Sequence, residues 1–413
     1  MKTRPDGILI LIYLLLMATG WVSIFFTTYQ HAGFEINTSY GMQLIWAGTS
    51  VILGIFVYII NKRFYFNFSA YIYVFFAFLI VLVIFIGKEK SGAKSWLGIG
   101  RFGIQPSEMA KYATCLLLAR YVSMREVDLS YWKNALGALL IVGIPILLIL
   151  LQNDTGTALP LLFLVFALFR DGLTPWLLVA GFLAIVLFIC SIFLPQWIVL
   201  LAVTFLFLAL FIHSLRKKIK NIGLLIVVFA SIVLYTFSVD LLYNKVLQPH
   251  QKQRIDLLFG KIDDIKGIGY NTNQAKIAIG SGGLLGKGFG EGTQTKLNFV
   301  PEQSTDFIFC TIGEEHGFVG TTLVVLLYFV LIWRIIALAE KANDAFIRCY
   351  GYCIASIFFA HFAINIGMVI GLMPVIGIPL PFISYGGSSL WAFTLMLFTF
   401  INIEAHNTGK NWK

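Results

Sequence analysis

Apolar residues run in long stretches along most of this chain, and polar residues gather in the short segments between them. A helix needs about 20 mainly apolar residues to cross a membrane, within a range of roughly 17–25. Membrane-spanning β-strands would alternate apolar and polar residues over about ten positions instead. The pattern therefore predicts an all-α polytopic membrane protein with about twelve transmembrane helices. We expect these helices at residues 8–28, 43–60, 69–87, 106–123, 135–151, 155–169, 175–194, 196–213, 221–239, 317–338, 346–371 and 382–402.

The composition agrees with this class. Of the 413 residues, 59% are hydrophobic and 12% are charged, whereas soluble domains carry about 25% charged residues. This excludes a disordered chain and argues against a soluble enzyme, whose surface needs more charge. The five cysteines fall mostly inside apolar runs, so we predict neither a disulfide framework nor a metal site. The net charge of +10 comes from basic residues in loops, which favours contact with anionic lipid and not with nucleic acid.

The distribution of Lys and Arg predicts the orientation in the membrane. One set of alternate short loops, together with both tails, carries seventeen basic residues, and the opposite short loops carry none. Because cytoplasmic loops are enriched in basic residues, we expect both termini in the cytoplasm. Residues 240–305 then form one large extracytoplasmic loop within a single membrane domain, residues 1–413. The opposite short loops are residues 29–42, 152–154, 195 and 372–381.

The short loop at residues 88–105 departs from this rule, because it carries four basic residues on the predicted outer side. One interpretation is an anionic partner that these residues, Lys94 and Arg101 among them, attract there. The other is a solvated loop whose charge Glu89 partly neutralises.

Ionisable residues at membrane depth are costly and point to function. Glu108 and Lys111 open one predicted span three residues apart, so their side chains can meet on one helix face. They form either a salt-bridged helix start, or a site in which Lys111 faces an outer-leaflet cavity and binds phosphate. Asp154 lies in an Asn/Asp/Thr/Gly turn, where a helix cap is the alternative to a functional role.

Residues 280–292 are rich in glycine, but their spacing matches neither of the two nucleotide-binding glycine patterns. Their backbone N–H groups are able to approach a lipid pyrophosphate, or the segment is a flexible re-entrant turn.

Two further segments carry candidate chemistry. Glu302 and Asp306 precede an apolar helix, so Asp306 is either part of a helix start or a general base beside apolar surface. Residues 374–389 contain three prolines and two adjacent glycines, which interrupt a helix. Broken backbone at membrane depth is tolerated where it is buried or lines a cavity, so we predict a re-entrant segment that contacts substrate.

Taken together, these motifs resemble the SEDS family (shape, elongation, division and sporulation). Six motifs stand in the family's order between about residues 88 and 404, and the form of residues 280–288 favours its RodA branch over its FtsW branch. The six motifs are Lys94–Leu97, Pro106–Lys111, Asp154–Thr157, Gln274–Gly283, Thr305–Phe309 and Pro379–Ser388.

The resemblance implies an inverting peptidoglycan glycosyltransferase that polymerises lipid II at the outer face of the bacterial cytoplasmic membrane, with a class B penicillin-binding protein as partner. It implies a core of ten spans, so two of the twelve predicted here are extra. It places the catalytic general base at Asp306. A divalent cation is possible, and no other cofactor is expected. The substrate-binding candidates are Lys94, Arg101, Glu108, Lys111, Asp154, Arg254, Gln274, Glu302, Ser384 and Ser388.

Two other functions fit parts of the pattern. A lipid II flippase would also carry charges within its spans. However, the sequence shows no clear inverted repeat, and its polar motifs cluster on the predicted outer side. A non-catalytic scaffold of the cell-wall synthesis complex would not need basic residues next to Asp306.

Overall fold

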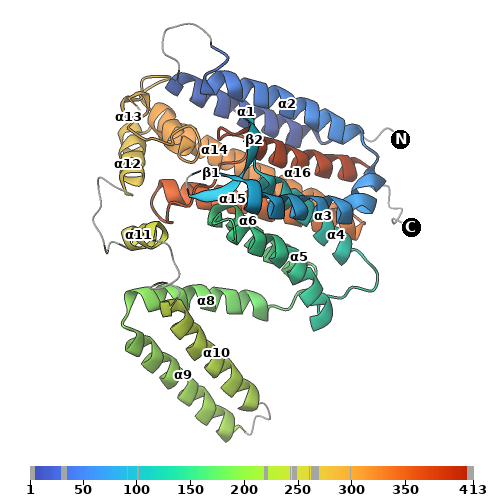
Figure 1. Cartoon of the computed structure of the whole chain (residues 1–413), viewed down its shortest axis with the longest axis vertical. Helices are drawn as coiled ribbons and strands as arrows, with labels where there is room; N and C mark the ends of the chain where they lie inside the picture. Colours follow the sequence, from blue (N-terminus) through green and yellow to red (C-terminus); the bar gives the residue numbers. More distant parts are fainter. Residues whose placement is uncertain are drawn as a thin grey trace. The chain divides into compact units, whose positions relative to one another are not determined.

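The structure is a computed structural model, and it divides into two compact units (Figure 1). Unit 1 comprises Met1–Leu173 and Asp263–Lys413, and unit 2 comprises Thr174–Ile262. The described residues are 5–28, 35–90, 92–99, 102–217, 222–241, 243, 249–259, 261, 269–297 and 299–406.

Helices dominate both units, and each of the twelve predicted spans lies on one or more helices. Among the described residues, nine helices are long and apolar enough to cross a membrane. The mainly helical, multi-pass architecture is thus confirmed, whereas spanning by α4, α6 with α7, and α10 stays a prediction. The helices that coincide with predicted spans are α1 Gly7–Thr28, α2 Ser39–Ile59, α3 Lys62–Ile86, α4 Pro106–Val122, α5 Trp132–Leu150, α6 Thr155–Leu162, α7 Leu164–Arg170, α8 Trp176–Phe193, α9 Gln196–Arg216, α10 Ile222–Leu241, α14 Ile308–Lys341, α15 Ala345–Val369 and α16 Gly387–Ala405.

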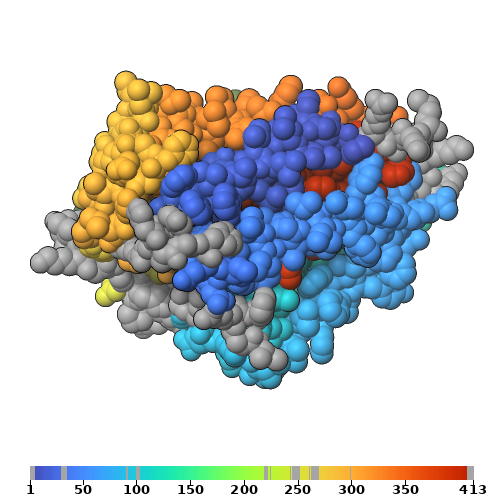
Figure 2. Space-filling view, turned by 90° about the horizontal axis from the view of Figure 1, so that it is seen from above, coloured from blue at the N-terminus to red at the C-terminus, as the bar shows by residue number. Residues whose placement is uncertain are grey.

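The centre of unit 1 is built from α15 and α16, which are the most buried of the candidate spans. Helix α15 packs against α4 and α14, and α16 packs against α2 and α4. Figure 2 shows α1 and α2 lying across one face of the unit, with parts of α16 visible between them. Polar groups on α4, α15 and the start of α16 are therefore held in the interior of the bundle.

The chain between α15 and α16 is not helical, as the prolines and glycines there predict. We call residues 370–386 the broken segment. Its backbone turns back near the end, where Phe382 has a φ of 66° and Ser384 N–H donates to Leu380 O at 3.0 Å. For this reason α16 begins at Gly387 and not at the predicted residue 382.

The predicted loop at residues 88–105 contains a small antiparallel sheet that the sequence analysis did not anticipate. Its strands are β1 Lys88–Lys90, β2 Ala93–Ile99 and β3 Phe102–Ile104, in the order β1-β2-β3. The backbone N–H of Lys94 on β2 donates to Gln152 O at 3.1 Å. This bond fixes the sheet to the turn between α5 and α6.

Unit 2 holds α8, α9 and α10 together with the short helix α11 Pro249–Leu258. Phe207 and Phe229 stack between α9 and α10 with ring centroids 4.2 Å apart, and Tyr235 of α10 donates to Ala184 O of α8 at 3.0 Å. The helical hairpin α9–α10 corresponds to the two apparently extra spans.

The second half of the predicted 240–305 loop forms α12 Tyr270–Gly282 and α13 Thr293–Lys296, with the glycine-rich stretch between them. These elements pack against the start of α14, which kinks at Gly317. Gly317 has a φ of 61°, and a Cβ there would lie 2.3 Å from Gly286 N, so no other residue fits this contact. The long part of α14 therefore starts where the predicted span at 317–338 does.

Glu314 links the glycine-rich stretch, residues 280–292, and the following α13 to α14 by hydrogen bonds. Its buried carboxylate accepts hydrogen bonds from Lys287 Nζ at 2.7 Å, from Gln294 N–H at 2.9 Å and from Thr295 N–H at 2.9 Å. Lys287, which lies within the glycine-rich stretch, thus forms an ion pair with Glu314. This arrangement supports an ordered turn in place of the flexible one considered from the sequence.

We expect Glu314→Gln to lower the free energy of unfolding by about 2 kcal/mol, because the new amide group would face N–H donors that now meet a carboxylate. Glu291→Gln is the matched control, since Glu291 lies exposed in the same stretch. Thermal unfolding in detergent measures both variants. Equal unfolding midpoints for the two would contradict this role of Glu314.

Candidate functional site

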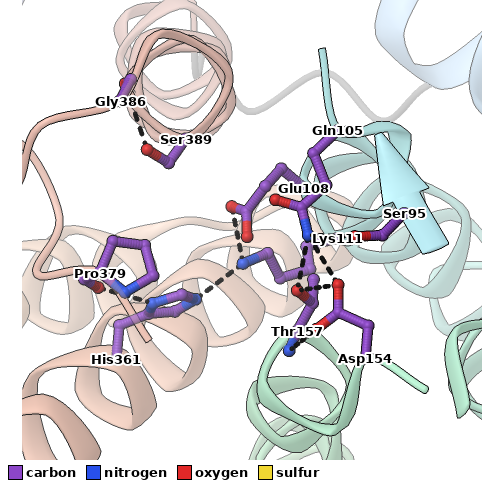
Figure 3. Close-up of polar contacts among 10 residues, drawn as sticks. All are labelled: Ser95, Gln105, Glu108, Lys111, Asp154, Thr157, His361, Pro379, Gly386 and Ser389. Atoms are coloured by element: carbon purple, nitrogen blue, oxygen red, sulfur yellow. Dashed lines mark hydrogen bonds and ion pairs between the residues drawn. The ribbon is translucent and has the colours of Figure 1, made fainter. Parts of the chain in front are cut away.

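A buried ion pair stands at the start of α4 (Figure 3). Lys111 Nζ lies 2.9 Å from Glu108 Oε2, which confirms that the two side chains meet on one helix face. Glu108 is 3% exposed and Lys111 is fully buried. The ammonium group also lies over the ring of Phe393 on α16, 5.3 Å from its centroid. Lys111 therefore offers no exposed surface to a phosphate in this arrangement, and its contact with substrate stays a prediction.

His361 on α15 completes this group, which we call the α4–α15 cluster (Glu108, Lys111 and His361). Its Nε2 lies 2.8 Å from Lys111 Nζ, and its Nδ1 lies 3.0 Å from Pro379 O in the broken segment (Figure 3). A carbonyl oxygen only accepts, so the proton must be on Nδ1, and Nε2 accepts from the ammonium group. The imidazole is accordingly neutral and links α4 to the broken segment.

A second polar group lies beside the cluster in Figure 3 and joins three elements. Gln105, just before α4, donates from Nε2 to Asp154 Oδ2 at 2.6 Å and to Ser95 Oγ of β2 at 3.4 Å. Asp154 caps α6, one of the two roles considered from the sequence, and accepts from Thr157 N–H at 3.1 Å. Gln105 and Asp154 thus hold the sheet, α4 and α6 in fixed register.

Asp306 lies just before α14, in a turn that is tied to α15 and to the broken segment. Asn365 Nδ2 on α15 donates to Asp306 O at 2.8 Å. Ser384 Oγ donates to the neighbouring Thr305 O at 2.6 Å. Asp306 is a half-buried residue, and its carboxylate Oδ2 is 3.2 Å from where a Cβ on Gly377 would lie. The Asp306 carboxylate therefore lies close to Gly377 of the broken segment.

The broken segment also touches α6, where a Cβ on Gly156 would lie 2.9 Å from Ile376 O. Residues 154–157, 304–307 and 376–384 consequently meet, although they are far apart in the sequence. The structure thus brings together Glu108, Lys111, Asp154, Asp306 and Ser384 of the predicted site.

Other predicted residues lie at the edge of this assembly or elsewhere in unit 1. Glu302 is exposed and accepts from Thr305 Oγ1 at 2.8 Å. Lys94 is exposed on β2 and donates to Phe85 O at 3.2 Å. Gln274 is half-buried on α12, and Ser388 is buried in the first turn of α16.

Two predicted cations cannot be placed at the site. Arg101 lies outside the described residues. Arg254 lies on α11 of unit 2, half-buried, and unit 2 is described only by itself. Within the described residues, no group of three or more His, Cys, Asp or Glu side chains is arranged to hold a metal ion.

Three residues that the sequence analysis did not single out as candidates are central to the geometry, namely Gln105, His361 and Asn365. His361 and Asn365 are four residues apart in an otherwise apolar run, so they lie on one face of a predicted span. Two polar residues on one face of a span are the sequence feature that points to both of them.

The fold and the site define a polytopic helical membrane protein with an acidic residue held beside a broken segment. The model of the FtsW/RodA/SpoVE family, described as cell cycle proteins, matches residues 6–203 and 196–409. The peptidoglycan glycosyltransferase RodA of Treponema pallidum is 33% identical over 429 residues, covering 97% of each chain. The peptidoglycan glycosyltransferase MrdB of Escherichia coli is 34% identical over 331 residues, covering 80% of this chain and 76% of its own. This chain belongs to the FtsW/RodA/SpoVE family, which confirms the resemblance to the SEDS proteins.

A solved structure agrees with this fold. This chain superposes with a TM-score of 0.71, at 24% identity, on a chain from a peptidoglycan synthase complex. That structure is described as showing the structural coordination of polymerization and crosslinking. The match covers 98% of this chain and 99% of that one. The match therefore extends over nearly the full length of both chains.

Proposed function

We propose that Asp306 is the general base of the peptidoglycan glycosyltransferase activity that this chain carries. The activity class rests on family membership and on the curated relatives of that name, which match at about a third of positions. The observation that supports the role of Asp306 is the position of its carboxylate beside Gly377, in a turn that α15 and the broken segment hold by their hydrogen bonds.

The reaction that we assign is a single displacement between two molecules of lipid II. The acceptor sugar hydroxyl attacks the anomeric carbon of the donor and gives its proton to the Asp306 carboxylate. The new glycosidic bond forms as the bond from that carbon to the lipid pyrophosphate breaks, with inversion. Positive charge near the departing pyrophosphate stabilises it. For that contact we propose Lys94, which is exposed on β2.

We place the reaction on the extracytoplasmic face. The loops with no basic residues include 152–154 and 372–381, and these two segments lie together around Gly156 and Ile376. Loops without basic residues are typical of the outer side. We also propose a class B penicillin-binding protein as the partner, which fits the similarity to a chain of a synthase complex that couples polymerization to crosslinking.

The proposal is tested with the purified full-length chain, its class B partner and fluorescent lipid II in detergent. We expect glycan ladders with the wild-type chain and none with Asp306→Asn. Transbilayer movement of lipid II in vesicles without any ladder would favour a transporter. An Asp306→Asn variant that polymerises at the normal rate would remove Asp306 from the mechanism.

Gly377→Ala is expected to lower the polymerisation rate by about tenfold, since the added methyl group would press on Asp306 Oδ2 from 3.2 Å. The backbone strain at a φ of 80° costs about 1–2 kcal/mol in addition. Gly172→Ala is the control, because Gly172 has a φ of 105° and nothing within 4 Å of its Cβ position. If Gly377→Ala and Gly172→Ala polymerise at equal rates per folded molecule, contact with Asp306 does not explain the effect, and backbone strain alone does.

A further inference from the structure

Two polar residues on α15 face the segments that surround Asp306. His361 and Asn365 are four residues apart and therefore lie on the same side of the helix. His361 is 1% exposed and Asn365 is fully buried. Burying such groups costs free energy unless they are hydrogen-bonded, so their contacts determine what they do.

Asn365 bonds two segments with one amide group. Its Nδ2 donates to Asp306 O at 2.8 Å and to Ile378 O at 2.7 Å. The group has two hydrogens, and both are used in these bonds. One planar side chain therefore links the Asp306 backbone directly to the broken segment, in addition to the bond from Ser384 Oγ to Thr305 O.

His361 holds the next carbonyl of the broken segment, one helical turn before Asn365. Its Nδ1 donates to Pro379 O, while its Nε2 accepts from Lys111 of the buried ion pair. The imidazole is thus fixed from both sides. Adjacent carbonyls, those of Ile378 and Pro379, are held by adjacent turns of the same helix.

We infer that Asn365 and His361 are positioning residues, which set the place of the Asp306 carboxylate relative to the broken segment. This inference rests on the proposed role of Asp306. Neither side chain needs to touch substrate. A general base must lie within hydrogen-bond reach of its proton, and a displacement of about 1 Å can cost a factor of about 100 in rate.

The test is Asn365→Asp in the full-length chain, assayed with fluorescent lipid II and the class B partner. A carboxyl group, even when protonated, can donate to only one of the two carbonyls that Asn365 now holds. We expect the turnover number per folded molecule to fall about 10-fold to 100-fold, with the KM for lipid II changed less than about twofold.

The chain offers a matched control in Asn402 on α16. This residue is also fully buried, and its Nδ2 donates to the carbonyls of Val57, Tyr58 and Ile60, away from Asp306. Asn402→Asp should lower the unfolding midpoint as Asn365→Asp does, yet leave the turnover number of the folded fraction unchanged. If both variants lose turnover equally, or neither does, the inference is overturned.

A pair of variants at His361 covers the case in which Asn365→Asp does not fold. His361→Gln keeps one donor and one acceptor and should retain most of the turnover, whereas His361→Leu removes both and should lose at least tenfold. Equal turnover in this pair contradicts the inference. Failure of the proposed function looks different, because Asp306→Asn would then be active whatever the α15 variants do.

Discussion

Asp306→Asn is expected to reduce the turnover number for glycan formation by about 100-fold to 10,000-fold, the range that a positioned general base contributes. The substitution removes the carboxylate but keeps the size and shape of the side chain. The contact that holds this turn to α15 uses the backbone carbonyl of residue 306, so it survives the change. The loss should therefore appear in turnover and not in stability.

Asp128→Asn is the control for the same chemical change at an exposed loop position. Asp128 accepts from Ser130 N–H at 2.9 Å, and this bond lowers the pKa of its carboxyl group. The variant should polymerise lipid II at the wild-type rate. Similar losses in both variants, or an unfolding midpoint that falls only with Asp306→Asn, would contradict a catalytic role for Asp306.

The largest effect on stability is expected from Lys111→Met, which should lower the free energy of unfolding by about 3–5 kcal/mol. Methionine fills a similar volume but leaves the Glu108 carboxylate buried without its cation and His361 Nε2 without a donor. Breaking a buried pair from one side is costly because the remaining charge is uncompensated. Thermal unfolding in detergent and the yield of folded protein both measure this loss.

The double variant Glu108→Gln with Lys111→Met should recover most of that loss, since it removes both charges together. The exposed pair Arg170–Glu340 provides the comparison, with an N–O distance of 2.7 Å and side chains 46% and 41% exposed. Arg170→Met should cost under about 1 kcal/mol. A Lys111→Met variant as stable as Arg170→Met would show that the buried pair does not hold the bundle together.

Local features of this site could be predicted from the sequence because their causes lie within a few residues. The three-residue spacing of Glu108 and Lys111 is enough to place them together, and Asp154 stands where a cap for Thr157 N–H is expected. The interruption at residues 370–386 follows from prolines and glycines.

The remaining geometry depends on packing between distant segments. Lys111 and His361 are 250 residues apart in the sequence, and no spacing rule pairs them. The start of α14 shows the same limit. Phe307 precedes the helix and makes no side-chain cap, and the turn before it is held by the bond from Tyr385 N–H to Ser304 O, between segments 81 residues apart in the sequence.

The α4–α15 cluster has one acidic, one basic and one neutral member, so its formal charges sum to zero. Moving one elementary charge through the membrane potential changes its energy by about 2.3 kcal/mol per 100 mV. The energy of a cluster with no net charge changes very little with the membrane potential. We therefore expect the membrane potential to leave the contacts of the α4–α15 cluster unchanged, so that these contacts are the same in energised vesicles and in detergent.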